Sequence, residues 1–338
     1  MTKELIIAIL LFIVGLVLLI KGGDWFVDGA SGIAKRLHIP EILIGATVVS
    51  IGTTLPEVMV SATSAAVGAG ALAYGNAIGS VICNTALIAA LTVTIKPAAA
   101  ERKSLIIPVI FFFASAVFYA VCAYVFGYFY RWAGILLLLV FVGYIVLSSI
   151  QAKRESKLLS AEELGETESE NDGEKKPEGR KKGLIKDIVF LVIGAALIAG
   201  GAKLLVDNGT KIAEIIGIPQ SVIALTFVAL GTSLPELVTA ITSLVKGHGA
   251  LSLGNLIGAN LFNIVLVSGV SITIAPFAVP AEALFFGLNR SLVIDIPVMF
   301  AVMLVLTVPA LIRGKLSRWQ GIVLLAIYAA FCVVQFAF

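Results

Sequence analysis

The sequence predicts an all-α integral membrane protein with ten transmembrane helices, arranged as two inverted five-helix repeats in which helices 2, 3, 7 and 8 are discontinuous. Three observations support this prediction. Apolar residues make up 59% of the chain and charged residues only 13%, bilayer-length apolar segments occur ten times, and part of the first half recurs in the second. A typical soluble protein is about 45–50% apolar and about one quarter charged. A lipid bilayer is therefore the expected solvent and partner of this chain.

A transmembrane helix needs about 20 mainly apolar residues. The predicted spans are residues 5–33, 41–67, 72–94, 104–126, 132–150, 184–206, 220–245, 250–274, 290–312 and 318–337. No small-residue cleavage site follows the first apolar run, so we expect that run to remain as the first helix. The three cysteines lie far apart in apolar runs and are expected to be buried small hydrophobic residues.

One strongly charged segment separates the two groups of five spans. Residues 151–183 contain 17 charged residues in 33, which is typical of a solvated, disordered connector. The predicted organisation is a first repeat in residues 1–150, a charged loop in 151–183 and a second repeat in 184–338.

The distribution of lysine and arginine predicts the orientation in the membrane. If the N-terminus is outside, the inward loops contain eighteen of these residues and the outward segments four. Cytoplasmic loops are enriched in Lys and Arg. Both termini are therefore expected outside a cell membrane, with loop 151–183 in the cytoplasm. The net charge of +3 is too small to suggest a nucleic-acid partner.

Internal repetition is the most specific feature of the sequence. A shift of 179 residues places residues 28–84 on 207–263 without a gap, and 24 of the 57 positions are identical. The shared segments include GT(T/S)LPE, which ends in Glu57 and Glu236, and GNxIG(S/A)xxxN. Because each repeat has an odd number of spans, the second copy enters the membrane from the opposite side. Secondary transporters often have this architecture, with the substrate site at the midplane between the repeats.

The GT(T/S)LPE segments supply oxygen ligands near the middle of two predicted spans. An ionised carboxylate there costs about 3 kcal/mol or more, so Glu57 and Glu236 must face a polar interior. Pro56 and Pro235 cannot donate a backbone hydrogen bond, which leaves nearby carbonyl oxygens available. Hydroxyl oxygens are added by Thr53, Thr54, Thr232 and Ser233.

This set of ligands suits a hard cation. Calcium takes about 6–8 oxygen ligands in a flexible arrangement, whereas softer metals would require Cys or His. Sodium could use the same oxygens, and competition at one site gives exchange.

A second set of polar residues occurs at i, i+4 and i+8 in the third span, namely Asn76, Ser80 and Asn84. The corresponding residues of the second repeat are Asn255, Ala259 and Asn263. The two asparagines Asn76 and Asn255 suit interhelical hydrogen bonding equally well.

The paired GT(T/S)LPE and GNxIG(S/A)xxxN segments resemble the alpha repeats of prokaryotic-type sodium/calcium exchangers, in the cation/calcium exchanger superfamily. The resemblance implies a ten-helix inverted-repeat fold and antiport of calcium against sodium. It implies a calcium site of Glu57, Glu236, Thr53 and Thr232. It also implies sodium contacts from those residues, from the backbone carbonyls of Ser50 and Ala229, and from Ser80, Asn84 and Asn263.

Two departures from the family pattern leave the second cation open. Ala259 replaces a common serine, and asparagine occupies both positions 84 and 263, where the family often has one aspartate. A proton/calcium exchanger of the same fold is therefore an alternative to sodium exchange, and a passive cation channel is a weaker one. No cofactor is expected beyond the transported ions, no enzyme motif is found, and the chain is expected to act as a monomer.

Overall fold

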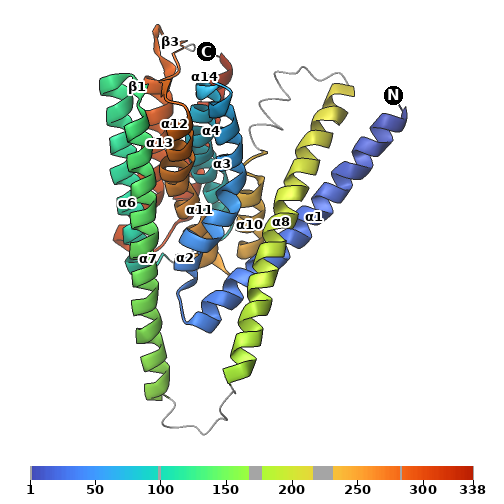
Figure 1. Ribbon diagram of the computed structural model, residues 1–338, viewed down its shortest axis with the longest axis vertical. Helices are drawn as coiled ribbons and strands as arrows, with labels where there is room; N and C mark the ends of the chain where they lie inside the picture. Colours follow the sequence, from blue (N-terminus) through green and yellow to red (C-terminus); the bar gives the residue numbers. More distant parts are fainter. Residues whose placement is uncertain (1, 98–99, 167–176, 216–230, 282–283, 338) are drawn as a thin grey trace.

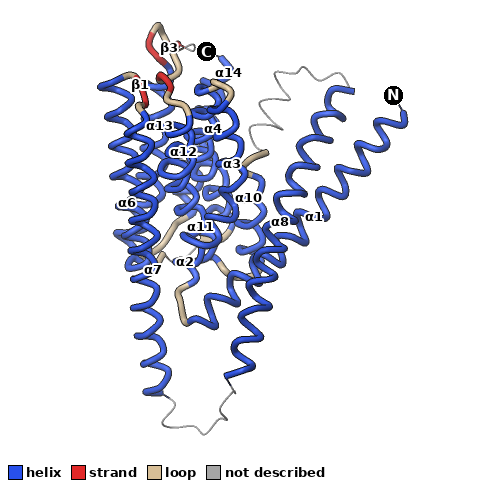
Figure 2. Tube along the Cα trace, in the orientation of Figure 1, coloured by secondary structure: helices blue, strands red, loops and turns tan. Residues whose placement is uncertain are grey.

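The computed structural model describes residues 2–97, 100–166, 177–215, 231–281 and 284–337, and most of these residues are helical (Figure 2). The α-helices are α1 (Thr2–Leu37), α2 (Glu41–Ile44), α3 (Ser50–Ala66), α4 (Gly70–Cys83), α5 (Ala90–Ile95), α6 (Arg102–Val121), α7 (Arg131–Glu166), α8 (Pro177–Ile215), α10 (Leu234–Val245), α11 (Gly249–Phe262), α12 (Ser268–Ile274), α13 (Ile296–Arg313) and α14 (Arg318–Ala337). Two short antiparallel strand pairs complete the described structure: β1 (Tyr128–Phe129) with β2 (Phe277–Ala278), and β3 (Leu284–Phe285) with β4 (Leu288–Asn289).

Nine helices in the described part of the chain are long and apolar enough to cross a membrane. They correspond to all of the predicted spans except 220–245. The first part of that span lies outside the described residues, and its second part forms the short apolar helix α10. The chain is thus a multi-pass, all-helical membrane protein.

Three of the helices predicted to be discontinuous are continuous helices that contain π-helical turns. These turns are η1 (Gly45–Val49) between α2 and α3, η2 (Asn84–Ala89) between α4 and α5, and η6 (Asn263–Val267) between α11 and α12. The predicted opening at Pro56 does not occur, because α3 continues through this residue. A π-helical turn alters the backbone hydrogen-bond ladder without unwinding the chain, and such turns are frequent at functional sites. Two further π-helical turns, η3 (Cys122–Phe126) and η7 (Ser291–Asp295), flank α6 and α13.

Helices α1 and α8 form a long antiparallel pair beside the other helices (Figure 1). Their backbones approach closely at glycines: a Cβ atom on Gly15 would lie 2.9 Å from the carbonyl oxygen of Gly201, and one on Gly22 would lie 2.8 Å from the nitrogen of Ile198. Small residues allow such close approach between membrane helices. The pair packs in an apolar cluster around Leu19 and Phe26, which is separate from the main core and also includes Ile44, Val49 and Leu251 of the neighbouring helices.

The remaining helices of the two halves interlock reciprocally. Helix α7 packs on α12 and α14 on α5, while α6 packs on α11 and α13 on α4. The main apolar core accordingly draws from both halves of the chain, with large buried side chains such as Phe112, Tyr119 and Phe262. Neither half buries its apolar surface alone.

The charged connector differs from the prediction of disorder. Helix α7 continues through Glu166 and α8 begins at Pro177, so only residues 167–176 of the predicted loop fall outside the described chain. Residues 151–166 are rich in Lys, Glu, Leu and Ala, which favour helix even when solvated. These ends of α7 and α8 project at one end of the molecule, and the N-terminal end of α1 and the C-terminal end of α14 lie at the other (Figure 1).

Candidate cation-binding site

Glu57 and Glu236 lie fully buried on two helices that contact each other. Glu57 is on α3 and Glu236 is in the first turn of α10, and both side chains are 0% exposed. Within the described residues, none of their four carboxylate oxygens has a hydrogen-bond partner. The two carboxylates are close enough for their charges to interact. Buried charges are stable only when paired or bound to a metal, so this arrangement suits a cation between them.

The two prolines of the repeated motif occupy different places in their helices. Pro56 lies inside α3, whereas Pro235 lies at the start of α10, where a backbone N–H has no helical partner anyway. The carbonyl oxygen of Gly231 accepts a hydrogen bond from the backbone N–H of Leu234 at 3.4 Å. The two copies therefore present different backbone groups to the site.

Two more homologous pairs supply buried polar atoms without partners among the described residues. They are the hydroxyls of Thr54 and Ser233 and the amide oxygens of Asn84 and Asn263. The two asparagines begin the π-helical turns η2 and η6. Because α3 packs on η6 and α10 packs on η2, each glutamate helix lies against the asparagine segment of the other half.

The donor set fits a hard cation. Carboxylate, hydroxyl and amide oxygens at six buried positions are the ligand types that calcium takes, in numbers of about 6–8. Within the described residues, no three His, Cys, Asp or Glu side chains cluster in a way that could hold a metal ion. A thiolate or imidazole metal centre is thus not found in that part of the chain.

Reciprocal hydrogen bonds connect the two repeats next to the carboxylates. The Thr53 hydroxyl donates to the amide oxygen of Asn255 at 3.1 Å, and the homologous Thr232 hydroxyl donates to that of Asn76 at 3.3 Å. Thr53 also lies beside the Glu236 carboxylate of the opposite repeat. Since a hydroxyl that donates keeps its lone pairs, both threonines can still offer oxygen to an ion.

The two asparagines of these pairs hydrogen-bond between helices, as one of the two sequence-based alternatives predicted. The Asn76 amide also donates to the backbone oxygen of Glu57 at 3.2 Å and to the Ser61 hydroxyl at 2.8 Å. Asn255 has no such additional bond in the described structure, and its amide nitrogen is buried without a partner. Asn76 thus positions the Glu57 turn, and Asn255 holds Thr53.

The other residues predicted to contact sodium differ in their surroundings. The Ser50 carbonyl oxygen accepts a hydrogen bond from the Thr53 hydroxyl at 3.5 Å. The Ser50 hydroxyl itself donates to the carbonyl oxygens of Gly45 at 2.7 Å and Asn255 at 2.9 Å, and Ser80 is buried on α4. Ala259 is buried on α11, and its carbonyl accepts a hydrogen bond from the Asn263 amide at 3.0 Å. Ala229 lies outside the described residues.

Sequence reasoning missed Asn260, which lies three residues before Asn263. Its amide nitrogen is 2.7 Å from the Thr85 hydroxyl and 3.2 Å from the Met303 sulfur, and its oxygen has no partner among the described residues. It therefore connects α11 to η2 of the first half. The repeat alignment could have indicated Asn260, because it places this polar residue opposite the apolar Val81. A polar residue that occurs in only one copy of a membrane repeat points to a function specific to that copy.

In the second repeat the glycines of the GNxIG segment allow close helix packing, whereas a Cβ atom on Gly75 or Gly79 of the first repeat would meet nothing within 4 Å. A Cβ atom on Gly258 would lie 2.7 Å from the Cα and oxygen atoms of Ala46, and one on Gly254 would lie 2.9 Å from the carbonyl carbon of Ile42. Helix α11 thereby packs directly on the backbone of α2 and η1, which lead into Ser50 and Thr53.

Comparison with known proteins agrees with this fold. The family model described as sodium/calcium exchanger protein matches residues 7–150 and 186–337. The chain is 34% identical to the sodium/calcium exchanger MaX1 of Methanosarcina acetivorans, over 97% of this chain and 98% of that protein. It is also 34% identical to the inner membrane protein YrbG of Escherichia coli, over 88% and 89% of the two chains.

A solved structure of the sodium-calcium exchanger NCX_Mj, soaked with Na⁺ and Sr²⁺, superposes with a TM-score of 0.80. The identity is 30%, and the match covers 97% of this chain and 99% of that one. Sequence family, full-length relatives and fold agree, and the chain belongs to the sodium/calcium exchanger family.

Proposed function

We propose that the chain is a secondary active antiporter that exchanges calcium for sodium across the cell membrane by alternating access. Exchange of cations, including calcium, is the activity of its family. The observation that supports the proposal most strongly is the pair of buried homologous carboxylates, Glu57 and Glu236, whose oxygens have no protein partner among the described residues. Their charge balances one divalent cation or two monovalent ones.

The proposed ion site uses both repeats. Glu57, Glu236, Thr53 and Thr232 would hold calcium. The hydroxyls of Thr54 and Ser233 would add oxygens to this central cluster. Sodium would use the calcium-site residues together with Ser50, Ala229, Ser80, Asn84 and Asn263. The use of Na⁺ and Sr²⁺ with the NCX_Mj structure is in keeping with a site that accepts a monovalent and a divalent ion.

The proposed architecture is ten helices in two inverted repeats, residues 1–150 and 184–338, joined by the charged segment 151–183. Reciprocal packing of α7 on α12 and α14 on α5, and the matched Thr–Asn hydrogen bonds, support a twofold relation between the halves. In the proposed orientation both termini are outside, the charged segment is cytoplasmic and the monomer is the working unit.

Alternating access requires one part of the molecule to move against another past the site. The α1–α8 pair meets the other helices through an apolar cluster apart from the main core, and Phe26 of α1 lies next to Gly52 beside Thr53. A small cavity between the pair and the bundle is lined by residues that include Thr53 and Pro235. This boundary is the place where a relative movement would open or close the site.

Proton/calcium exchange is the second candidate function. Ala259 removes one hydroxyl from the second repeat, and paired amides at Asn84 and Asn263 leave two central carboxylates. Two carboxylates that can each bind a proton would provide the counter-ion sites that such an exchanger needs.

Calcium uptake into vesicles that contain the purified chain distinguishes these functions. An outward sodium gradient imposed alone should drive uptake, and a pH gradient or a potassium gradient alone should not. Uptake driven by the pH gradient alone would support the proton exchanger. Uptake that needs no counter-ion gradient and does not saturate would indicate a channel.

A matched variant pair tests the site in the same vesicles. Glu57→Gln should abolish sodium-driven uptake, because one of two central charges is lost. Glu41→Gln changes the same kind of side chain at the half-exposed start of α2 and should leave uptake intact. Normal transport by Glu57→Gln would refute the proposed site.

A further inference from the structure

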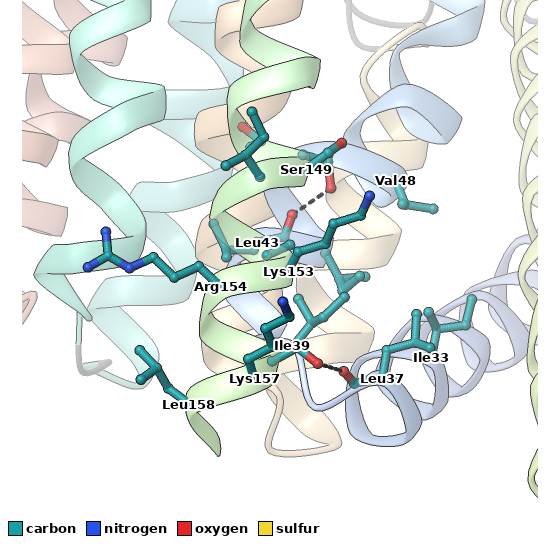
Figure 3. Close-up of a pocket in the computed structure, with 16 residues that line it drawn as sticks. Ile33, Leu37, Ile39, Leu43, Val48, Ser149, Lys153, Arg154, Lys157 and Leu158 are labelled. Atoms are coloured by element: carbon teal, nitrogen blue, oxygen red, sulfur yellow. Dashed lines mark hydrogen bonds between the residues drawn. The ribbon is translucent and has the colours of Figure 1, made fainter. Parts of the chain in front are cut away.

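A groove of about 1010 Å³ lies between the C-terminal part of α7 and the turn that joins α1 to α2 (Figure 3). Its walls come from Ile33 and Leu37 of α1, Ile39 of the turn, Leu43 and Val48 near η1, and Ile150 of α7. The Ser156 hydroxyl of α7 donates to the Leu37 carbonyl at 2.6 Å and ties α7 to the end of α1 beside the groove.

The walls of the groove expose large apolar side chains that no described residue covers. Ile150 and Leu158 are each 57% exposed, and Val48 is 38% exposed. These residues belong to the membrane spans 41–66 and 131–158. An apolar surface within a span faces hydrocarbon, so the groove suits an acyl chain better than a soluble ligand.

One end of the same groove is positively charged. Lys153 and Lys157 are one helical turn apart on α7, in line with Ser149, and Arg154 lies between them. In Figure 3, Lys153 extends toward Val48 and Arg154 extends to the opposite side of α7. None of the sixteen residues that line the groove is acidic.

Neighbouring acidic groups do not neutralise these lysines in the part of the chain that the structure describes. Glu155 accepts a hydrogen bond from the Gln151 side chain at 2.7 Å, and Asp187 pairs with Arg36 at 2.5 Å. No ion pair of Lys153 or Lys157 is found there. The groove therefore joins an apolar wall to two cations that have no ion pair among the described residues, at the end of a transmembrane span.

We propose that this groove binds an anionic phospholipid, with its phosphate at Lys153 and Lys157 and an acyl chain along Val48 and Ile150. Basic residues at the membrane surface contribute about 1 kcal/mol each to binding of anionic lipids. A zwitterionic lipid offers the same acyl chains, but the cation of its headgroup opposes the lysines. Charge complementarity thus selects an anionic headgroup.

Lipid binding to the full-length chain in detergent tests the proposal, by titration with short-chain phosphatidylglycerol or phosphatidylcholine and native mass spectrometry. Phosphatidylglycerol should bind at least tenfold more tightly. The K153Q/K157Q variant should lose about 30-fold in phosphatidylglycerol affinity, which is ~1 kcal/mol for each lysine. The matched control R313Q removes an exposed cation at the end of α13 that does not line the groove, and should bind as the wild type does.

Two further measurements distinguish lipid binding in the groove from binding to a charged surface and from binding of phosphate alone. Ile150→Trp fills the apolar wall, leaves every charge in place and should weaken phosphatidylglycerol binding. Millimolar glycerol 3-phosphate should not displace the lipid. Equal affinity for the two lipids, unchanged binding by K153Q/K157Q or by Ile150→Trp, or displacement by glycerol 3-phosphate would each overturn the proposal.

Discussion

Replacing each member of the homologous pair Asn76 and Asn255 with alanine should destabilise the protein unequally. Asn76 makes three side-chain hydrogen bonds, to the Glu57 carbonyl, to Ser61 and to Thr232. Asn255 makes one, from Thr53, and its amide nitrogen has no partner among the described residues. Interhelical hydrogen bonds in membrane proteins average about 0.6 kcal/mol. The expected loss of unfolding free energy is therefore ~2 kcal/mol for Asn76→Ala and ~0.6 kcal/mol for Asn255→Ala.

The assay is equilibrium unfolding of the purified protein in mixed micelles by titration with sodium dodecyl sulfate, without calcium or sodium. Both variants remove the same atoms from homologous helix positions, so helix propensity and side-chain volume cancel in the comparison. The difference isolates the hydrogen bonds. Equal losses, or a larger loss for Asn255→Ala, would refute the roles assigned to the two asparagines.

Two other substitutions test separate features. Ala259→Ser adds a hydroxyl oxygen next to Asn263, so the sodium concentration that halves calcium uptake should fall several-fold. An unchanged concentration would contradict a sodium contact at this position. Gly258→Ala should lower the unfolding free energy by about 1–3 kcal/mol, because its Cβ would lie 2.7 Å from Ala46. The matched variant Gly200→Ala meets no described atom within 4 Å and should not destabilise α8. Similar losses for the two glycine variants would show that the close approach of α11 to η1 is not required.

Much of the fold could be predicted because hydropathy and the repeat both reflect strong constraints. Apolar span length is fixed by bilayer thickness, and nine predicted spans match described helices closely. Paired Glu57 and Glu236 could be predicted to be buried, since an acid in a span must face the interior. The sequence alone allowed Asn76 and Asn255 either to contact an ion or to hydrogen-bond between helices. The structure shows the interhelical hydrogen bonds.

Other features depend on tertiary contacts that composition does not encode. The proline at position 56 predicted an opened helix, but the irregularity is a π-helical turn at residues 45–49, where Gly45 and Gly258 allow close packing of α11. Charge density predicted disorder in 151–183, but helix propensity extends α7 through Glu166. The contact of Asn260 with Thr85 joins residues 175 apart in sequence, and no local pattern indicates it.

The central claim is that calcium and sodium compete for one site built on Glu57 and Glu236. Calcium binding to the purified full-length chain, measured by isothermal titration at increasing sodium, tests it most directly. One calcium ion should bind each chain, its apparent dissociation constant should rise steadily with sodium, and both effects should vanish in Glu57→Gln and Glu236→Gln. Calcium binding that is independent of sodium, or that survives both substitutions, would contradict the claim.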